Sequence, residues 1–439
     1  MSSPTDTADP NQTKVIIVGI GIGGLSAAIE CQHKGYKVTV FDRITQVEKK
    51  KGDVIGIAQN GARVMATWGN GEFFERTRDL RYQSDGGVIF DSTGRHVVTS
   101  TMPGYRPDEG FVFNRGACVS AMYDYAVSIG VDVRLGAEVT GYWEGECEAG
   151  VIVQGERMAA DCVVCAEGIN SRAMIAITGY DFEERSTGIS IIRGNLDAGL
   201  LVGDPDLAWV LELSGADKGY MWHSGTAQFS IWCKMGCTPE LFWYGAYKDE
   251  ECKDPNPVGP ILEAIKDWPV KNQLEPIIHK APTQRIIRQK LTHREPLKTW
   301  LSPGCRIIVT GDAAHVPVPA GGQGGSQAIE DAAVLAICLE LAGKENIPLA
   351  LQVTEKIRYR RATEVQKRSR EMLEKSHSMS LEQMRRGEIP FLYLIPYWFY
   401  GHDCQSYTYK EFPIVVEAIQ SGREYLPRNF AVDDSIHID

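Results

Sequence analysis

A glycine-rich turn near the start of the chain limits its possible folds more than any other feature. Residues 14–18 form an apolar run typical of a buried strand, and 25–34 repeat apolar residues with helical spacing. A second strand is predicted for 37–41, so the whole unit has the size of a parallel βαβ element. The turn after the first strand matches GxGxxG, with glycines at Gly19, Gly21 and Gly24.

Each of these glycines has a physical role in binding a dinucleotide. Gly19 permits the tight turn, Gly21 lets the backbone approach a pyrophosphate, and Gly24 lets the helix pack against the strand. The free N–H groups at the helix N-terminus then face the phosphates. Asp42 ends the second strand, where its carboxylate can accept hydrogen bonds from ribose hydroxyls. The unit therefore predicts a Rossmann-type site, without distinguishing FAD from NAD.

A second glycine-rich segment, far along the chain, points to FAD. Residues 306–310 predict a buried strand that ends in GDAAH, which places Asp312 at the carboxyl end of a sheet. Its carboxylate can accept hydrogen bonds from ribityl hydroxyls, and the helix predicted from Ser326 to about Leu341 would turn its positive end toward a reduced flavin. The intervening loop, PAGGQGG, contains Gly322, Gly324 and Gly325.

The middle of the chain has a different pattern of apolar and polar residues. Residues 187–290 alternate in the manner of an antiparallel sheet with one face on a pocket, and they hold five of the nine tryptophans. Strands are predicted here at 188–192, 208–213, 219–223 and 227–234. Elsewhere helices are expected at 60–68, 115–129 and 350–385, and strands at 131–135, 151–154 and 162–165.

The predicted fold is α/β, with a discontinuous Rossmann-type FAD-binding domain around an inserted, mainly antiparallel sheet domain and a helical C-terminal region. We expect the FAD-binding domain to comprise 13–75, 105–185 and 290–385. The substrate-binding sheet domain would comprise 76–104 and 186–289. Residues 386–439, which include Trp398-Phe399-Tyr400, are expected to cap the pocket or to form a subunit contact.

Three segments resemble the group A FAD-dependent monooxygenases, or flavin aromatic hydroxylases, and specifically their fungal salicylate-hydroxylase-like branch. They read VIIVGIGIGGLSAAI, VVCAEGINS and GDAAHVPVPAGGQGGSQAIEDAAVLA, with weaker matches at NRGACVSAMYDYA, YRRATEVQKRSR and WFYGHD. The resemblance implies FAD contacts at Gly19, Gly21, Gly24, Asp42, Arg115, Asp312, Gly322, Gly324 and Gly325. The family more often has Glu at position 42, and Asp where Glu167 stands, which leaves the role of Glu167 open.

The resemblance also implies the chemistry. NAD(P)H, more often NADPH, would reduce FAD during a transient visit, because the chain has no second Rossmann fingerprint. Reduced flavin would capture O2 as a C4a-hydroperoxide, whose distal oxygen passes to an electron-rich carbon. Hydroxylation or epoxidation of an aromatic or indole-like secondary metabolite is expected. The protein supplies orientation, a dry pocket and charge.

Three side chains of the inserted sheet are candidates for catalysis. Arg193 matches a position where related hydroxylases often place an arginine facing substrate; the alternative is an arginine on a solvated strand face. Tyr220 and His223 lie on opposite faces of one predicted strand, so at most one of them faces the pocket. Acid–base catalysis by either competes with a structural role, and His315 is expected to be structural.

Other features narrow the function by exclusion. The 46 basic and 57 acidic residues give a net charge of −11, which argues against a nucleic-acid partner. Eleven scattered cysteines, including Cys162 and Cys165 in a strand-like run, indicate buried free thiols rather than a metal site. The start of the chain lacks the pattern of a signal peptide, and the apolar stretch 391–400 is too short to span a membrane. We therefore expect a cytoplasmic monomer or homodimer that binds a small aromatic substrate and O2.

The sequence also bears on two other possible functions and on one part of the protein surface. A flavin halogenase is disfavoured because Trp222 has no second tryptophan at the halogenase offset, and a flavin-linked reductase stays open. A non-catalytic flavin-binding scaffold is disfavoured by the intact cofactor loops. Charged residues at helical spacing predict a solvated helix face formed by Glu355, Arg358, Arg360, Arg361, Glu364 and Lys367.

Overall fold

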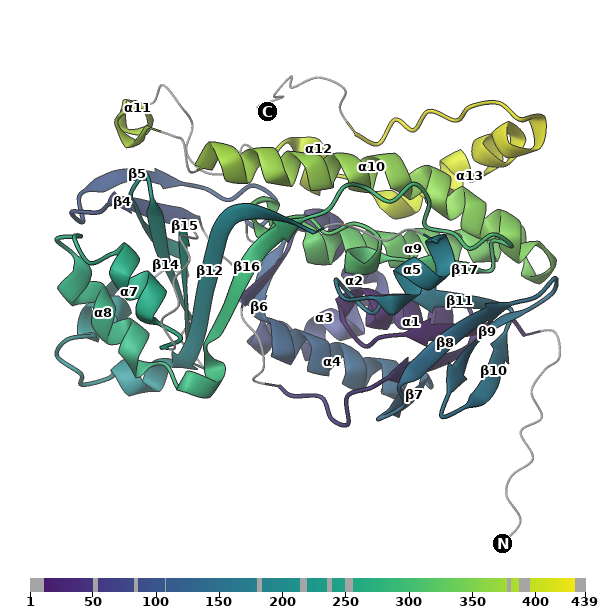
Figure 1. The fold of residues 1–439 in the computed structure, drawn as a ribbon, viewed down its shortest axis with the longest axis horizontal. Coiled ribbons are helices and arrows are strands. Elements are labelled where there is room, and N and C mark those ends of the chain that lie inside the picture. The colour runs from purple at the N-terminus through teal and green to yellow at the C-terminus, as the bar shows by residue number, and fades with distance from the viewer. Residues whose placement is uncertain are drawn as a thin grey trace, which may run out of the picture.

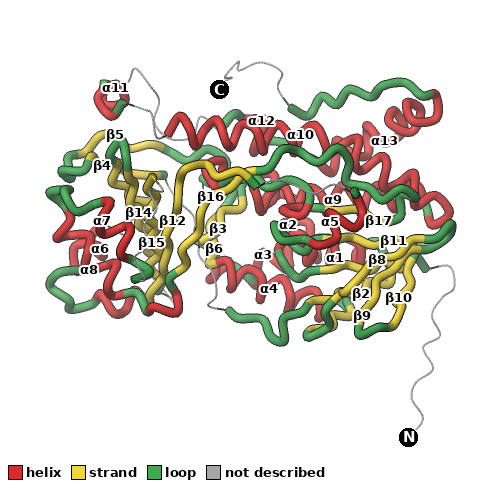
Figure 2. The backbone as a smooth tube through the Cα atoms, in the orientation of Figure 1, coloured by secondary structure: helices red, strands yellow, loops and turns green. Residues whose placement is uncertain are grey.

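The computed structural model describes residues 12–49, 54–82, 86–106, 108–179, 184–213, 219–234, 239–248, 256–376, 380–386 and 395–430. Two large sheets lie at opposite ends of the molecule, with helices beside and between them (Figures 1 and 2). This arrangement is the α/β class predicted from the sequence. No helix in the described ranges is long and apolar enough to cross a membrane.

A parallel five-stranded sheet forms one end of the molecule. Its strand order is β17 (Ile307–Val309), β11 (Cys162–Cys165), β1 (Lys14–Val18), β2 (Lys37–Asp42) and β7 (Asp132–Leu135). The strands β1 and β11 bury apolar side chains on both faces, as parallel strands covered by helices do. Both glycine-rich turns therefore begin at the same edge of one sheet.

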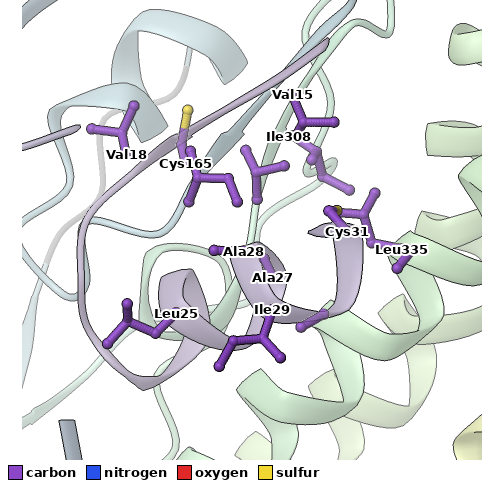
Figure 3. Close-up of a cluster of buried hydrophobic side chains, with 14 of the residues drawn as sticks. Val15, Val18, Leu25, Ala27, Ala28, Ile29, Cys31, Cys165, Ile308 and Leu335 are labelled. Atoms are coloured by element: carbon purple, nitrogen blue, oxygen red, sulfur yellow. The ribbon is translucent and has the colours of Figure 1, made fainter. Parts of the chain in front are cut away.

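The helices α1 (Ile22–His33) and α9 (Gly324–Ala342) pack with this sheet. Figure 3 shows Val15, Cys165 and Ile308 from three neighbouring strands gathered around α1, with Leu335 of α9 nearby. Cys162 and Cys165 are fully buried free thiols, and burial raises the pKa of Cys162 to about 12. A reactive thiolate is not favoured at such a site.

The seven-stranded sheet at the other end combines distant segments. Its order is β16 (Ile287–His293), β12 (Arg185–Asp197), β15 (Glu240–Lys248), β14 (Ala227–Lys234), β13 (Gly219–His223), β4 (Gly87–Asp91) and β5 (His96–Ser100). Only the β13–β4 pair is parallel. The helices α7 (Gly259–Ala264) and α8 (Lys271–Lys280) bury one face of this sheet.

One predicted strand in this region is wrong. Residues 208–213 form the helix α6 (Ala208–Leu213). Short apolar runs suit a strand or a buried helix equally, so their period alone does not decide. The structure decides for a helix because Leu207 and Val210, three residues apart, are buried together on the face that joins the core under the sheet.

The helix α10 (Ile347–Ser376) runs along the molecule beside both sheets (Figure 1). The predicted solvated face is wrong at Arg358 and Arg361, whose side chains are completely buried against α9. Arg360 and Lys367 of the same set are exposed, as predicted. The charged residues do lie at helical spacing, but the acids that pair with Arg358 and Arg361 lie on α9.

The remaining elements link these parts. They are β3 (Val54–Ile57), α2 (Gln59–Thr67), α3 (Glu72–Arg76), β6 (Phe111–Asn114), α4 (Arg115–Ser128), β8 (Val139–Glu144), β9 (Ala149–Val153), β10 (Glu156–Ala160), α5 (Arg172–Thr178), α11 (Leu381–Arg385), α12 (Tyr397–Tyr400) and α13 (Cys404–Ser421). Phe399 of α12 is fully buried in a cluster with Tyr105 and Val365, so it packs within the molecule.

Candidate flavin and substrate site

The first glycine turn has the geometry that a pyrophosphate cradle needs. Gly19 has a φ of +105°, and a Cβ there would lie 2.4 Å from the carbonyl oxygen of Ala166. A Cβ on Gly24 would lie 1.9 Å from the carbonyl oxygen of Gly19, so this glycine permits the close helix–strand contact. No heavy atom lies within 4 Å of a Cβ built on Gly21. The open side of Gly21 at the start of α1 leaves room for a phosphate.

Asp42 supports this turn directly. Its Oδ2 accepts a hydrogen bond from the backbone N–H of Ile20 at 2.8 Å, and its Oδ1 accepts one from Ile44 at 2.9 Å. A carboxylate oxygen has more than one lone pair, so these bonds leave acceptor capacity for a ribose. Asp42 therefore stabilises the glycine turn, in addition to the ribose contact predicted for it.

Asp312 and Arg115 interact electrostatically beside the second turn. Asp312 follows β17 and Arg115 begins α4, and both side chains are exposed. Surrounding protein raises the pKa of the Asp312 carboxyl, and the charges of His315, Arg115 and Arg294 partly oppose that rise. The acceptor and the cation predicted for FAD are therefore brought together, although the sequence separates them widely.

A hydrogen bond from Tyr105 holds the glycine loop before α9. Gly322 has a φ of +62°, and its carbonyl oxygen accepts a 2.8 Å hydrogen bond from the hydroxyl of Tyr105. A Cβ on Gly324 would lie 3.9 Å from Asp312 Oδ1, and one on Gly325 would lie 3.1 Å from Ile55. The three predicted glycines of this loop thus lie between Asp312, Tyr105 and β3.

A buried ionic network that the sequence interpretation missed holds the Asp312 turn. Asp331 accepts hydrogen bonds from the backbone N–H of Gly311 at 2.9 Å, from His315 at 2.6 Å and from Arg358 at 2.8 Å. These positive partners hold the pKa of Asp331 down at about 2 despite its burial. The structural role predicted for His315 agrees with its position.

Glu330, the neighbour of Asp331, extends the network to residues 398–429. It binds Arg361 through both carboxylate oxygens, each at 2.8 Å, and accepts from Asn60 at 2.6 Å. Arg361 also donates to the carbonyl oxygens of Trp398 and Asn429. The adjacent acids Glu330 and Asp331, in the middle of a mostly apolar helix, were the available sequence signal, since buried charges require partners.

Glu167 caps a helix. Its Oε2 accepts a hydrogen bond from the Ser171 hydroxyl at 2.7 Å and one from the Ala173 backbone N–H at 3.1 Å. Both donors lie at the start of α5, where backbone N–H groups lack helical partners. The extra methylene relative to Asp is therefore used for local capping.

An apolar cavity of about 140 Å³ lies between the second glycine loop and the seven-stranded sheet. None of the described residues that line it carries a charge. Pro319, Ala320 and Gly322 form one wall, and the others are Val54, Gly56, Gly87, Val88, Ile89, Thr101, Met102, Tyr105, Val112, Gly219, Tyr220, Met221, Trp232 and Ile395. The sequence interpretation had named only Gly322 and Tyr220 of this set as site residues.

The three candidate catalytic residues are not gathered in one place. Tyr220 contributes to the cavity wall, but it packs with Trp222 in the core on the far face of the sheet. His223 and Arg193 do not line the cavity. The Arg193 guanidinium donates a 2.6 Å hydrogen bond to Gln289, and Arg193 lies opposite Tyr244 on the neighbouring strand.

Comparison with known proteins identifies the family of this chain. A family model for the FAD binding domain matches residues 12–369. FAD-dependent monooxygenase okaB of Penicillium ochrochloron is 46% identical over 96% of this chain and 95% of its own, and asperlicin C monooxygenase of Petromyces alliaceus is 40% identical over 97% and 94%. The crystal structure of CtdE in complex with FAD and substrate 4 has a TM-score of 0.87 at 36% identity, covering 93% of this chain and 100% of that one.

The chain therefore belongs to the FAD-dependent monooxygenases of the FAD-binding-domain family. Within that class it is similar to fungal monooxygenases that act in secondary metabolism. The predicted family, fold and FAD dependence are confirmed, and the halogenase, reductase and scaffold alternatives fall away.

Proposed function

We propose that the protein uses NAD(P)H and O2 to insert one oxygen atom into an uncharged, indole-like fungal metabolite. The observation that carries this proposal is the apolar cavity beside the second glycine loop, whose lining holds aromatic and aliphatic side chains without a charge. A small aromatic acid such as salicylate would leave its carboxylate without a cation in this lining. Relatives named for asperlicin C and notoamide E support a secondary-metabolite substrate.

The chain's own residues supply binding and exclusion of water. Asp312, Arg115 and the open side of Gly21 would hold FAD, which when bound accepts a hydride and activates O2. The α9 N-terminus offers backbone N–H groups and a positive partial charge to the reduced cofactor. Pro319 and Ala320 place the cavity next to this point, and the apolar lining keeps it dry.

Arg193 acts in this proposal at the edge of the substrate site. It shares the sheet face that packs against Val318 and Ala320 of the second glycine loop, through its neighbours Ile191 and Tyr244. Burial raises the pKa of Tyr220, which therefore remains a neutral phenol that can donate a hydrogen bond at the cavity wall. His223 lies in the same strand, beyond the lining.

The test is a turnover screen of the FAD-loaded protein under 18O2. NADPH and NADH oxidation, oxygen uptake and product mass are measured with a tryptophan–proline cyclic dipeptide, an indole alkaloid with additional fused rings, and salicylate. We expect the indole compounds to accelerate NADPH oxidation and to gain one labelled oxygen atom. Labelled product from salicylate alone would contradict the proposed substrate class.

A further inference from the structure

Two neighbouring glycines lie in the sheet wall of the cavity. Gly87 of β4 and Gly219 of β13 are directly paired, and Gly219 is also paired with Trp232 of β14. A Cβ on Gly219 would lie 2.5 Å from Nε1 of the Trp232 indole, so the pyrrole edge of this ring lies close over the strand. Glycine is unfavourable inside strands and marks such close approaches.

Gly87 differs from its neighbour. Its φ is not in the left-handed region, and the nearest atom to a Cβ built there is the Gly219 carbonyl oxygen at 3.7 Å, an ordinary contact. Neither backbone geometry nor a packed side chain therefore requires glycine at position 87. What the missing side chain provides is space in the cavity that Gly87 lines.

One face of the Trp232 ring is covered by Tyr244. The two rings stack with centroids 5.6 Å apart and an interplanar angle of 14°, and Trp232 also lines the cavity. The Tyr244 hydroxyl accepts a hydrogen bond from the buried amide of Gln228, which also contacts Ser230. Tyr244 and Ala320 pack against the same buried cluster, which contains Val318, so Tyr244 lies near the second glycine loop.

We propose that Trp232 is a platform on which the flat fused-ring system of the substrate stacks, and that Gly87 leaves room for a substituent on that ring. The inference rests on the proposed function and deepens it by naming two specificity-determining residues. Met102 and Met221 line the same cavity, and their unbranched thioethers adapt to substituents of different shape. The ligand class is an uncharged planar heteroaromatic that carries a bulky apolar branch.

The test uses FAD-loaded protein and two probes, the tryptophan–proline cyclic dipeptide and the same compound with a five-carbon branched alkenyl group on its indole. Binding is followed by perturbation of the flavin absorbance, and kcat and KM by labelled product. We expect Gly87→Ala to weaken binding of the branched probe about tenfold while the unbranched probe binds as before. Gly219→Ala should weaken both, because its methyl group displaces the Trp232 ring.

Variants of the platform itself complete the design. Trp232→Leu should raise KM for both probes about tenfold, whereas Trp232→Phe, which keeps a flat ring, should recover most of the affinity. Trp209→Leu is the matched control, because Trp209 packs against Trp222 on the far face of the sheet and does not line the cavity. FAD content and unfolding temperature identify any variant that fails to fold.

Two results would overturn the proposal in distinguishable ways. If wild-type protein oxidises both probes but Gly87→Ala does not discriminate between them, or Trp232→Leu leaves both KM values unchanged, the two assigned residues are wrong and the proposed function stands. If the wild-type protein neither binds nor oxidises either probe, the proposed substrate class fails and this inference fails with it.

Discussion

Asp312 is the residue from which we expect the largest single contribution to FAD binding. Its exposed carboxylate interacts with the charge of Arg115 and follows β17, the edge strand of the parallel sheet. The nearby acid Asp331 is buried and is occupied by three hydrogen bonds. FAD retention should therefore depend on this one carboxylate.

We predict that Asp312→Ala purifies colourless and binds added FAD at least about tenfold more weakly, since a charge-assisted hydrogen bond is lost. The flavin-to-protein absorbance ratio and an FAD titration measure this. Asp132→Asn, on an exposed surface ion pair with Arg134, is the control and should stay yellow. Yellow Asp312→Ala protein with normal turnover would remove Asp312 from the FAD site.

Arg193 should affect the use of oxygen more than the binding of flavin. Its side chain lies on the sheet face toward the second glycine loop, and the guanidinium donates a hydrogen bond to Gln289. We predict that Arg193→Ala retains FAD but diverts most NADPH consumption to hydrogen peroxide, which a coupled peroxidase assay compared with product yield would reveal. Unchanged coupling would show that Arg193 has no part in oxygen transfer.

The helix α10 shows at the scale of an element how far sequence reasoning reaches. Charges at i,i+3 and i,i+4 spacing look the same whether they face water or the acids of a neighbouring helix. The glycine turns, by contrast, were predictable because their backbone conformations allow few other residues. The α6 segment failed for a third reason, because six residues, five of them apolar, are too few to establish a period.

We predict that Arg361→Gln lowers the free energy of unfolding by about 3–5 kcal/mol, because the Glu330 carboxylate keeps its burial and loses its bidentate partner. Arg360→Gln, one residue earlier and exposed, should change it by less than about 0.5 kcal/mol. Chemical denaturation of the two variants in parallel decides the matter. Equal effects would mean that the network adds no stability.

His402, between α12 and α13, gives this region a pH dependence. Burial, followed by the charge of Arg361, lowers the pKa of His402 to about 3 from its usual 6.5. Below pH 6.5, His402 is therefore protonated in the unfolded chain but stays neutral in the folded protein. The free energy of unfolding falls as the pH is lowered from 6.5 to about 3, by up to about 1.4 kcal/mol per pH unit. His402→Gln should flatten this slope, whereas His279→Gln, at an exposed site, should not.

At the scale of the whole molecule, the two sheets share one helix. Val353 and Ile357 of α10 belong to the core of the five-stranded sheet, and Leu373 packs with Ile191 of the seven-stranded sheet. The parallel pairing of β13 with β4, from segments far apart in sequence, has no local signature and could not be predicted. The sequence predicted only that a sheet is inserted between the two glycine motifs.

This sharing predicts that both sheets unfold together. In urea, tryptophan fluorescence, which reports mainly on the seven-stranded sheet, and flavin release, which reports on the five-stranded one, should have the same midpoint. Leu373→Ala should shift both midpoints by the same amount. Separate transitions for the two signals would show that α10 does not couple the sheets.

The contacts of Arg361 have a consequence for how the protein matures in the cell. The guanidinium that neutralises Glu330 also binds the carbonyl oxygens of Trp398, Phe399 and Asn429. The acids behind the second glycine loop are therefore fully paired only after residues 398–429 have been synthesised. We expect flavin loading to follow that step, so that chains that do not yet include residue 429 lack cofactor and are open to proteolysis.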